Sequence, residues 1–437
     1  MRSEPNAGAS AGRAARVLIA VLFCGLIVGG AVRAEPTRQA DVPTQATPQA
    51  EALQAALADE AVQRALAALD ADAGQSAGFL AEIAAIVSPS GHEHDRARAV
   101  AERMREIGLQ EVRVDESPNA IGVVPGSSGK ALVFIATLDD LADVAEHQRA
   151  APHPPRIEGD RVVGPGTNTS STTAAVLAAA QALVQSGIRP HHDIVFAAVA
   201  QEETGLVGMN NVYDEYRDRA IGFVDVLGDG RSISYGALGL HWWRIVAHGP
   251  PGHSLGGGLP NVNQGIAQAV ERILALPQPR EYSELRTVLN VAQIHSGTVF
   301  NHKPETGWFS LDLRSLDGEV IAEMEAAVRQ ILGQVSEETG ITFEMEPFQI
   351  TPGGQIPGAL ESDLVQTSVA ISRHMGFEPR LGNSGSSNMN VAVGQGTLAI
   401  GLGGGRGGDR ATPEEWADIP ALIRTAKHVL LLAVAMR

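Results

Sequence analysis

Acidic residues follow two apolar runs of this sequence, and they are its first candidates for chemistry. Asp139 comes soon after the run 131–136, and Glu202 and Glu203 come soon after the run 193–199. Both runs have the length and composition of buried strands, so we expect these acids at strand ends. Without a nearby cation, adjacent carboxylates repel each other, and we expect at least one of Glu202 and Glu203 to take up a proton.

Other reactive side chains give weaker candidates. Two histidine pairs occur in loop-like segments, where a surface position is favoured over metal binding: His92 with His94, and His191 with His192. The one cysteine, Cys24, lies in the N-terminal segment, so the rest of the chain has neither a thiol nucleophile nor a thiolate ligand. Four serines lie in loops of an expected cleft, Ser170, Ser171, Ser384 and Ser386. No Gly-x-Ser-x-Gly turn joins a strand to a helix, which argues against a serine hydrolase.

The composition indicates a globular, acidic protein. Hydrophobic residues make up 44% of the 437 positions and aromatic residues only 4%, so Ala, Val, Leu and Ile are expected to fill the core. The net charge of −17 argues against a nucleic acid or an anionic membrane as partner, because both need clustered Lys and Arg.

The N-terminus has the pattern of a signal peptide. Arg13 and Arg16 precede an apolar run, residues 17–32, and Ala34 ends a small-residue cleavage site. We therefore expect residues 1–34 to be removed, the protein to be periplasmic or secreted, and no membrane partner to remain after cleavage. An uncleaved membrane anchor is the alternative, although the run is short for a span. Residues 35–77 are expected to be a linker and an N-terminal helix.

Strand-like and helix-like segments alternate over most of the chain, which predicts an α/β fold with a mostly parallel sheet flanked by helices. This domain is expected to comprise residues 78–236 and 352–437. Its expected strands are 111–114, 120–124, 131–136, 193–199 and 397–401, and its helices are 79–87, 94–107, 172–184, 362–375 and 418–435. Between them, residues 237–351 have four strand patterns, 240–248, 288–294, 306–314 and 342–346, and two helix patterns, 262–276 and 320–336. This segment predicts an inserted α+β sandwich.

Seven short segments, in one order along the chain, resemble a known family. They are Ser88-Pro89-Ser90-Gly91-His92-Glu93, Leu138-Asp139, Gly164-Pro165-Gly166, Gln201-Glu202-Glu203-Thr204-Gly205, Gly249-Pro250-Pro251-Gly252-His253-Ser254, Asp312-Leu313-Arg314 and Pro413-Glu414-Glu415-Trp416. The set resembles the zinc-dependent aminoacylase, acetylornithine deacetylase and glutamate carboxypeptidase family of metallopeptidases over roughly residues 78–435. The resemblance implies a zinc-exopeptidase-like fold whose inserted domain is a lid and a dimerisation domain, and hence a homodimer.

Members of this family bind two Zn²⁺ ions, which activate a water for attack on an amide. The resemblance places non-ligands at four expected metal positions: Thr137, Thr169, Leu227 and Ala411. Glu203 is the remnant ligand, and Asp225 or Asp229 would replace Leu227 if the loop shifts. A hydroxyl cannot replace the bridging carboxylate at similar affinity, so we expect a degenerate site without tightly bound zinc. Zinc is therefore implied by the resemblance alone.

The resemblance also implies roles for other residues. Glu202 matches the general base and Asp139 its orienting partner, although both would also suit hydrogen bonding and helix capping at strand ends. His253 matches the histidine that reaches a partner subunit's cleft and stabilises the tetrahedral intermediate, with a turn histidine as the alternative. The positions matched to substrate binding are Asn301, Arg314 and Asn388.

Two functions remain open at this point. In the first, the protein lacks two-metal hydrolysis and keeps the cleft to bind small peptides or N-acyl amino acids. In the second, it is an amide hydrolase, a peptidase or deacylase, that uses Glu202 as general base with an altered, single or absent metal. An ordinary zinc enzyme is less favoured, because the matches around Asp139 and around Glu202 and Glu203 contain no gaps.

Overall fold

A computed structural model describes residues 47–258, 260–277 and 282–437 of the chain. The expected signal peptide, residues 1–34, lies outside the described residues, as does the expected linker up to residue 46. The chain divides into the units Met1–Gln45 and Ala46–Arg437, and only the second is described here. None of the described helices combines the length and the apolar character that crossing a membrane requires.

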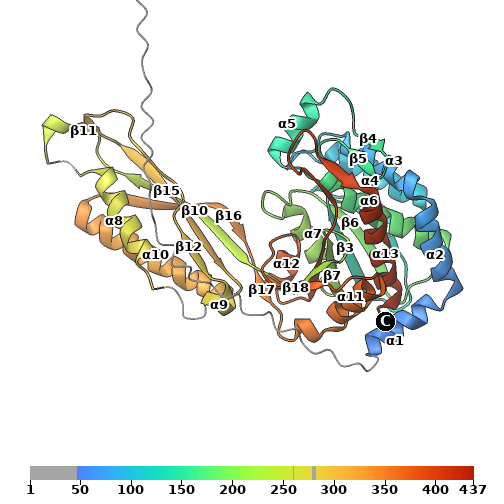
Figure 1. The fold of residues 1–437 in the computed structure, drawn as a ribbon. Helices are drawn as coiled ribbons and strands as arrows, with labels where there is room; N and C mark the ends of the chain where they lie inside the picture. Colours follow the sequence, from blue (N-terminus) through green and yellow to red (C-terminus); the bar gives the residue numbers. More distant parts are fainter. Residues whose placement is uncertain (1–46, 259, 278–281) are drawn as a thin grey trace, which may run out of the picture. The chain divides into compact units, whose positions relative to one another are not determined.

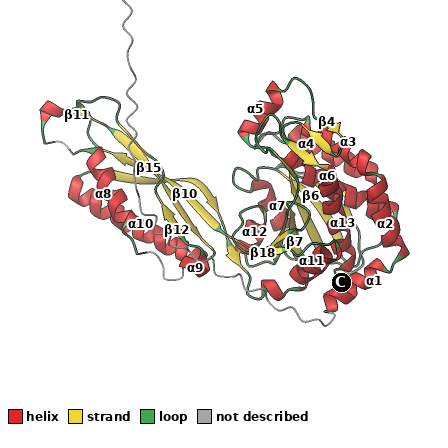
Figure 2. Ribbon diagram, viewed as in Figure 1, coloured by secondary structure: helices red, strands yellow, loops and turns green. Residues whose placement is uncertain are grey.

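A mixed eight-stranded sheet, in the order β1-β2-β6-β3-β7-β19-β8-β18, forms the centre of the α/β domain (Figures 1 and 2). Its strands are β1 (Gln110–Val114), β2 (Ala120–Val124), β3 (Ala131–Thr137), β6 (Asp193–Val199), β7 (Ala220–Val226), β8 (Ser232–Ser234), β18 (Arg380–Gly382) and β19 (Ala399–Gly403). The central strands β6, β3, β7 and β19 are parallel to one another, whereas β1, β2 and β8 make antiparallel pairs. The predicted α/β fold is confirmed, with a parallel centre, antiparallel pairs on either side of it, and one more parallel pair, between β8 and β18, at an edge of the sheet.

Helices cover both faces of this sheet. One face carries α1 (Pro48–Leu57), α2 (Glu60–Ala71), α3 (Ala73–Ala84), α4 (His94–Ile107), α6 (Thr167–Gln185), α11 (Asp363–His374) and α13 (Ile419–Ala435). The other face carries α7 (Val207–Tyr216) and α12 (Met389–Gly394). Because β3 and β6 are covered on both sides, their sequences are continuous apolar runs.

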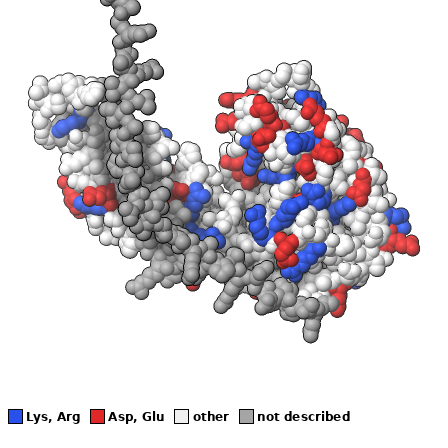
Figure 3. Space-filling view, viewed as in Figure 1, with Lys and Arg blue, Asp and Glu red and all other residues white. Residues whose placement is uncertain are grey.

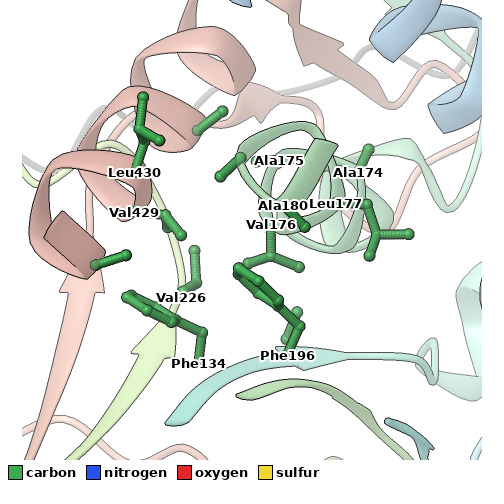
Figure 4. Close-up of a cluster of buried hydrophobic side chains, with 14 of the residues drawn as sticks. Phe134, Ala174, Ala175, Val176, Leu177, Ala180, Phe196, Val226, Val429 and Leu430 are labelled. Carbon is green, nitrogen blue, oxygen red and sulfur yellow. The ribbon is translucent and has the colours of Figure 1, made fainter. Parts of the chain in front are cut away.

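The core beneath α6 and α13 combines small helix residues with large strand residues. Figure 4 shows Phe134 and Phe196 of the sheet under Ala174, Val176 and neighbouring residues of α6. The two phenylalanine rings stack with their centroids 5.8 Å apart. The alanines of α6 let the helix approach the sheet closely, and burial of each phenylalanine contributes about 2–3 kcal/mol.

The folded body begins before Gly78, whereas the sequence analysis placed its start at Gly78. Leu53 of α1 and Val62 and Leu69 of α2 are buried and belong to the same core as the sheet. Thr47 and Asp59 cap α1 and α2, so two short helices lie where the sequence analysis expected one N-terminal helix.

The second sheet consists of strands between Gly239 and Thr351. Its order is β12-β15-β10-β16, and β13 also pairs with β15; all these pairs are antiparallel. The strands are β10 (Gly239–His248), β12 (Val288–Asn290), β13 (Ile294–Ser296), β15 (Thr306–Ser315) and β16 (Thr342–Thr351). Helices α8 (Val262–Leu274) and α10 (Gly318–Thr339) pack on one face through a core of their own. The predicted α+β sandwich is therefore confirmed as an architecture.

Lys and Arg side chains are interspersed with Asp and Glu side chains on the visible face of the α/β domain (Figure 3). Many of them form short-range ion pairs along helices, such as Arg103 with Glu106. Exposed pairs of this kind contribute about 0.2–1 kcal/mol each, so they favour solubility more than stability.

Candidate functional site

The buried carboxylate of Asp139 organises the carboxyl end of the central strands. It lies just after β3 and accepts hydrogen bonds from the backbone N–H groups of Glu202 (2.9 Å) and Glu203 (3.0 Å), which follow β6. The hydroxyl of Ser90 donates a third hydrogen bond to it. Carboxyl ends of neighbouring parallel strands meet at one edge of a sheet, which is where α/β proteins bind ligands. Asp139 therefore fixes the turn that carries both glutamates.

The segment around Ser90 supports the same turn. Glu93 accepts hydrogen bonds from the backbone N–H groups of Gly91 (2.7 Å) and Gln201 (3.0 Å). Burial raises the pKa of Glu93, although these hydrogen bonds oppose the shift. Gln201 has a φ of +56°, a left-handed conformation that costs a non-glycine residue about 1 kcal/mol or more. The two glutamates thus follow a strained residue held by hydrogen bonds.

Burial and mutual repulsion raise the proton affinity of the acids at this site. The pKa of Glu202 lies well above its usual value because of burial, and the charges of Glu203, Asp225 and Asp139 add to the shift. The pKa of Glu203 is also raised by burial, whereas Arg410 lowers it. These directions agree with the expectation that one of the adjacent glutamates holds a proton.

Two arginines from the loop after β19 lie among these acids, and the sequence analysis missed both. Arg410 Nη2 lies 3.0 Å from Glu203 Oε1. Burial and the neighbouring Arg410 lower the pKa of Arg406, while Glu202 and Asp225 stabilise its charged form. One signal was present in the sequence: Arg410 directly precedes Ala411, an expected metal position, and Arg406 lies in the same glycine-rich loop.

The expected metal positions Thr137, Thr169 and Ala411 all lie at this edge of the sheet. Thr137 Oγ1 accepts a hydrogen bond from Asn388 Nδ2 at 3.3 Å. The carboxylate of Glu415 accepts hydrogen bonds from the backbone N–H groups of Asn168 (2.8 Å) and Ala411 (3.0 Å), and so links the start of α6 to the arginine loop. Thr169 is buried in the first turn of that helix.

Asp225, rather than Leu227, is the strand-end residue whose charge acts on the site. The backbone N–H of Met389 donates to Asp225 Oδ2 at 3.3 Å, and burial raises the pKa of Asp225. Leu227 supplies only an apolar side chain beyond the end of β7. Asp229 is committed elsewhere: its oxygens accept from the backbone N–H of Gly405 (3.0 Å) and from Arg424 Nε (3.0 Å). Asp225 therefore lies among the acids of this site, whereas Asp229 has other partners.

Three residues expected to bind substrate or stabilise an intermediate have partners within their own domains. His253 Nε2 and Asn301 Nδ2 lie 2.9 Å apart near β11 (Gly252–His253) and β14 (His302–Lys303), and both side chains are exposed. Arg314 pairs with Asp312 on β15, with Nε 2.9 Å from Oδ1. Asn388 is buried rather than facing solvent.

The donor set at this edge of the sheet does not fit a pair of zinc ions. Two bridged Zn²⁺ ions need several imidazole and carboxylate ligands, but Thr137, Thr169 and Ala411 offer hydroxyl or methyl groups. Within the described ranges, no group of three or more His, Cys, Asp or Glu side chains is arranged to hold a metal ion. Arg410 engages Glu203, and a guanidinium donates hydrogen bonds and cannot ligate a cation.

The comparisons with known proteins agree with this architecture. The sequence model of peptidase family M20/M25/M40 matches residues 138–435. A comparison with curated proteins finds no match. Among solved structures, aminopeptidase PepT from Bacillus cereus has a TM-score of 0.69 at 20% identity, over 83% of this chain and 98% of its own.

Two further solved structures share the fold. Bacillus subtilis YXEP protein, described as a dinuclear metal binding peptidase, has a TM-score of 0.62 at 14% identity, over 84% of this chain and 98% of its own. Human carnosine dipeptidase 1 has a TM-score of 0.60 at 13% identity, over 86% of this chain and 99% of its own. At these identities, the likeness concerns the fold.

Proposed function

Because the chain belongs to peptidase family M20/M25/M40, we propose that it keeps the cleft of that family but uses two arginines in place of the metal pair. In this proposal the guanidinium groups of Arg406 and Arg410 balance the acids that would otherwise face zinc. The protein binds small peptides or N-acyl amino acids at the carboxyl end of β3, β6 and β7, and it does not carry out two-metal amide hydrolysis.

The contact between Arg410 and Glu203 carries this proposal. Glu203 matches the remaining ligand position, and its Oε1 atom is 3.0 Å from Arg410 Nη2. The pair is partly exposed, with 45% and 21% of the two side chains accessible, so its net energy is at most about 1 kcal/mol. Its significance lies in its position, because a metal at Glu203 would have to displace a cation already held there.

The same arginines supply the means of ligand binding. Arg410 is exposed enough to exchange Glu203 for the carboxylate of a peptide or of an N-acyl amino acid. Guanidinium and carboxylate groups form paired, charge-assisted hydrogen bonds, which give both affinity and orientation. The similar structures include an aminopeptidase and a dipeptidase, which supports the choice of this ligand class.

Metal analysis and calorimetry test the proposal. We expect purified protein, incubated with zinc and dialysed, to retain no stoichiometric zinc and to bind one or more members of a dipeptide and N-acyl amino acid panel. Arg410→Met is expected to weaken that binding by about tenfold. Arg217→Met, which removes an exposed arginine paired with Asp214, is the matched control and leaves binding unchanged. Two zinc ions per chain would overturn the proposal.

A second function is favoured by the raised pKa of Glu202. A general base works best when its pKa lies near the operating pH, and burial shifts Glu202 in that direction. The protein would then be an amide hydrolase in which Glu202 takes a proton from water. Amidase activity in metal-free protein that is lost in Glu202→Gln would support this function over simple binding.

Export and dimerisation are further parts of the proposal. The basic and apolar pattern of residues 1–34 supports cleavage and a periplasmic or secreted location. Mass spectrometry of protein from a secreting host is expected to find a mature N-terminus at Glu35. Sedimentation that finds only monomers would remove the homodimer, and with it the role of His253 in a partner subunit.

A further inference from the structure

The sheet of the inserted domain has one face that none of the domain's described helices covers. Residues alternate between the two faces of a strand, and Ile245 and Ala247 of β10 point into the core beneath α8 and α10. Trp242 and Arg244 of the same strand therefore point to the opposite face. The register pairs Trp242 with Asp312 and Val246 with Trp308, which puts Trp308 on this open face as well.

Aromatic side chains are concentrated on this open face. The sequence has only four tryptophans, and two of them, Trp242 and Trp308, line a pocket on this face with a volume of about 460 Å³. Phe348 of β16 lines it too, is 74% exposed, and lies with its ring centroid 6.3 Å from that of Trp242. A pocket of this volume with aromatic walls and a few polar groups is typical of small-molecule sites.

Arg244 is the polar group that distinguishes this pocket. Its guanidinium carbon lies 4.5 Å from the centroid of the Trp308 ring. His295 stacks on the same indole, with centroids 4.3 Å apart, and comes from β13 on the other side of β15. Among the described residues, no carboxylate forms an ion pair with Arg244. Its planar set of N–H donors is therefore positioned by stacking but not paired with an anion.

The other charged groups near Arg244 do not neutralise it. Asp312 lines the pocket, but its carboxylate is paired with Arg314, whose Nε lies 2.9 Å from Oδ1. Glu346 lies opposite Arg244 in the register of β10 and β16, and its side chain is exposed. The negative charges of these two acids repel a dianion such as a phosphate more strongly than they repel a monoanionic carboxylate.

We propose that this pocket binds a small organic carboxylate with a planar apolar ring. The carboxylate pairs with the guanidinium of Arg244, and the ring packs against Trp242 and Phe348. Offset or edge-to-face contacts between aromatic rings contribute beyond burial alone, and a paired guanidinium gives the carboxylate a fixed direction. The site is separate from the acids and arginines at the edge of the eight-stranded sheet and does not depend on their function.

Fluorescence titration of the full chain with 2-naphthoate tests this site, with 2-naphthamide as the neutral analogue. We expect saturable quenching of tryptophan emission by the acid, and binding of the amide that is weaker by about tenfold. Arg244→Met is expected to weaken naphthoate binding by the same factor. Glu346→Gln is expected to strengthen it, because one nearby negative charge is removed.

Matched variants locate the binding. Arg329 lies over Trp243 at 5.3 Å from the ring centroid, on the helix side of the sheet, so Arg329→Met controls for loss of an arginine beside a tryptophan. It is expected to leave naphthoate binding unchanged, as is Arg410→Met at the other site. Absence of saturable binding, equal binding by Arg244→Met and the unaltered chain, or loss of binding in Arg410→Met would each overturn the inference.

Discussion

His428 of α13 gives the chain a stability that depends on pH. The imidazole is fully buried beside Gly230 and Ser372, and burial lowers its pKa to about 4, although the nearby Asp229 charge partly opposes the shift. In the unfolded chain its pKa returns to about 6.5. Between these values the unfolded state binds a proton that the folded state does not, so the free energy of unfolding rises with pH.

The size of the effect follows from the two pKa values. The contribution is complete above about pH 6.5 and is lost as the pH falls toward 4. One pKa unit corresponds to about 1.4 kcal/mol, so the protein should lose about 3 kcal/mol between pH 7.5 and pH 4 through this residue. Buried acids with raised pKa values, such as Glu93 and Asp140, act in the opposite sense, since they favour the folded state as the pH falls.

A comparison of variants isolates the histidine from those acids. Between pH 7.5 and pH 4, we expect the free energy of unfolding of His428→Gln, measured with urea, to fall by about 3 kcal/mol less than that of the unaltered chain. His374→Gln, which replaces an exposed histidine near the end of α11, is the matched control and retains the full dependence. Parallel pH profiles for the unaltered chain and His428→Gln would refute the assignment.

Three further outcomes concern the supports of the site, each measured by urea unfolding. Arg96→Met leaves the carboxylate of Asp140 buried without its 2.7 Å partner, so we expect a loss of about 3–5 kcal/mol; the exposed Arg98→Met should cost less than about 1 kcal/mol. Gly208→Ala places a Cβ atom 2.6 Å from backbone atoms of a neighbouring turn, and we expect a loss of about 1–3 kcal/mol. Glu415→Gln keeps one acceptor oxygen where two are used, and we expect a loss of about 1–3 kcal/mol. Values near zero for Arg96→Met, Gly208→Ala or Glu415→Gln would contradict the packing described here.

Elements with a clear hydrophobic pattern were predicted well. The helix at 94–107 and the strands at 120–124 and 193–199 match α4, β2 and β6 to the residue. The helix has an apolar stripe and ends at Gly108, whose φ of +92° suits a helix terminus. The strands are buried on both faces, so their runs are apolar apart from Asp193 at the start of β6.

Elements whose form depends on distant contacts were predicted less well. Helix α6 begins at Thr167, ahead of the predicted residue 172, because its polar first turns are buried and hydrogen-bonded: Thr173 Oγ1 donates to the carbonyl of Thr137 at 3.0 Å. The expected strand 288–294 is two strands, β12 and β13. Between them the backbone N–H groups of Ala292 and Gln293 donate to Ser310 Oγ. These hydrogen bonds join residues that are distant in the sequence, so a local sequence pattern does not reveal them.

The site was predicted in part for the same reason. Asp139, Glu202 and Glu203 follow recognisable strands, and the structure brings them together through two hydrogen bonds. Arg406 and Arg410 lie in a glycine-rich loop without periodicity, so only the fold shows that they meet the acids. The sequence indicated the positions of the expected ligands but not the two arginines that lie beside them.

Charge balance connects the missing ligands with the two arginines. Three acids, Glu202, Glu203 and Asp225, surround the position where the family would hold four positive charges as two Zn²⁺ ions. With a proton on Glu202, as its raised pKa favours, the carboxylates of Glu203 and Asp225 balance the charges of Arg406 and Arg410. The carboxylate of Asp139 is stabilised separately, by hydrogen bonds from Ser90 and from the backbone N–H groups of Glu202 and Glu203. A carboxylate at position 169 in place of the threonine would leave one negative charge uncompensated in a buried site, which is costly. Under the proposed function, Thr169 is therefore the residue expected beside two arginines, just as an aspartate is the residue expected beside two zinc ions.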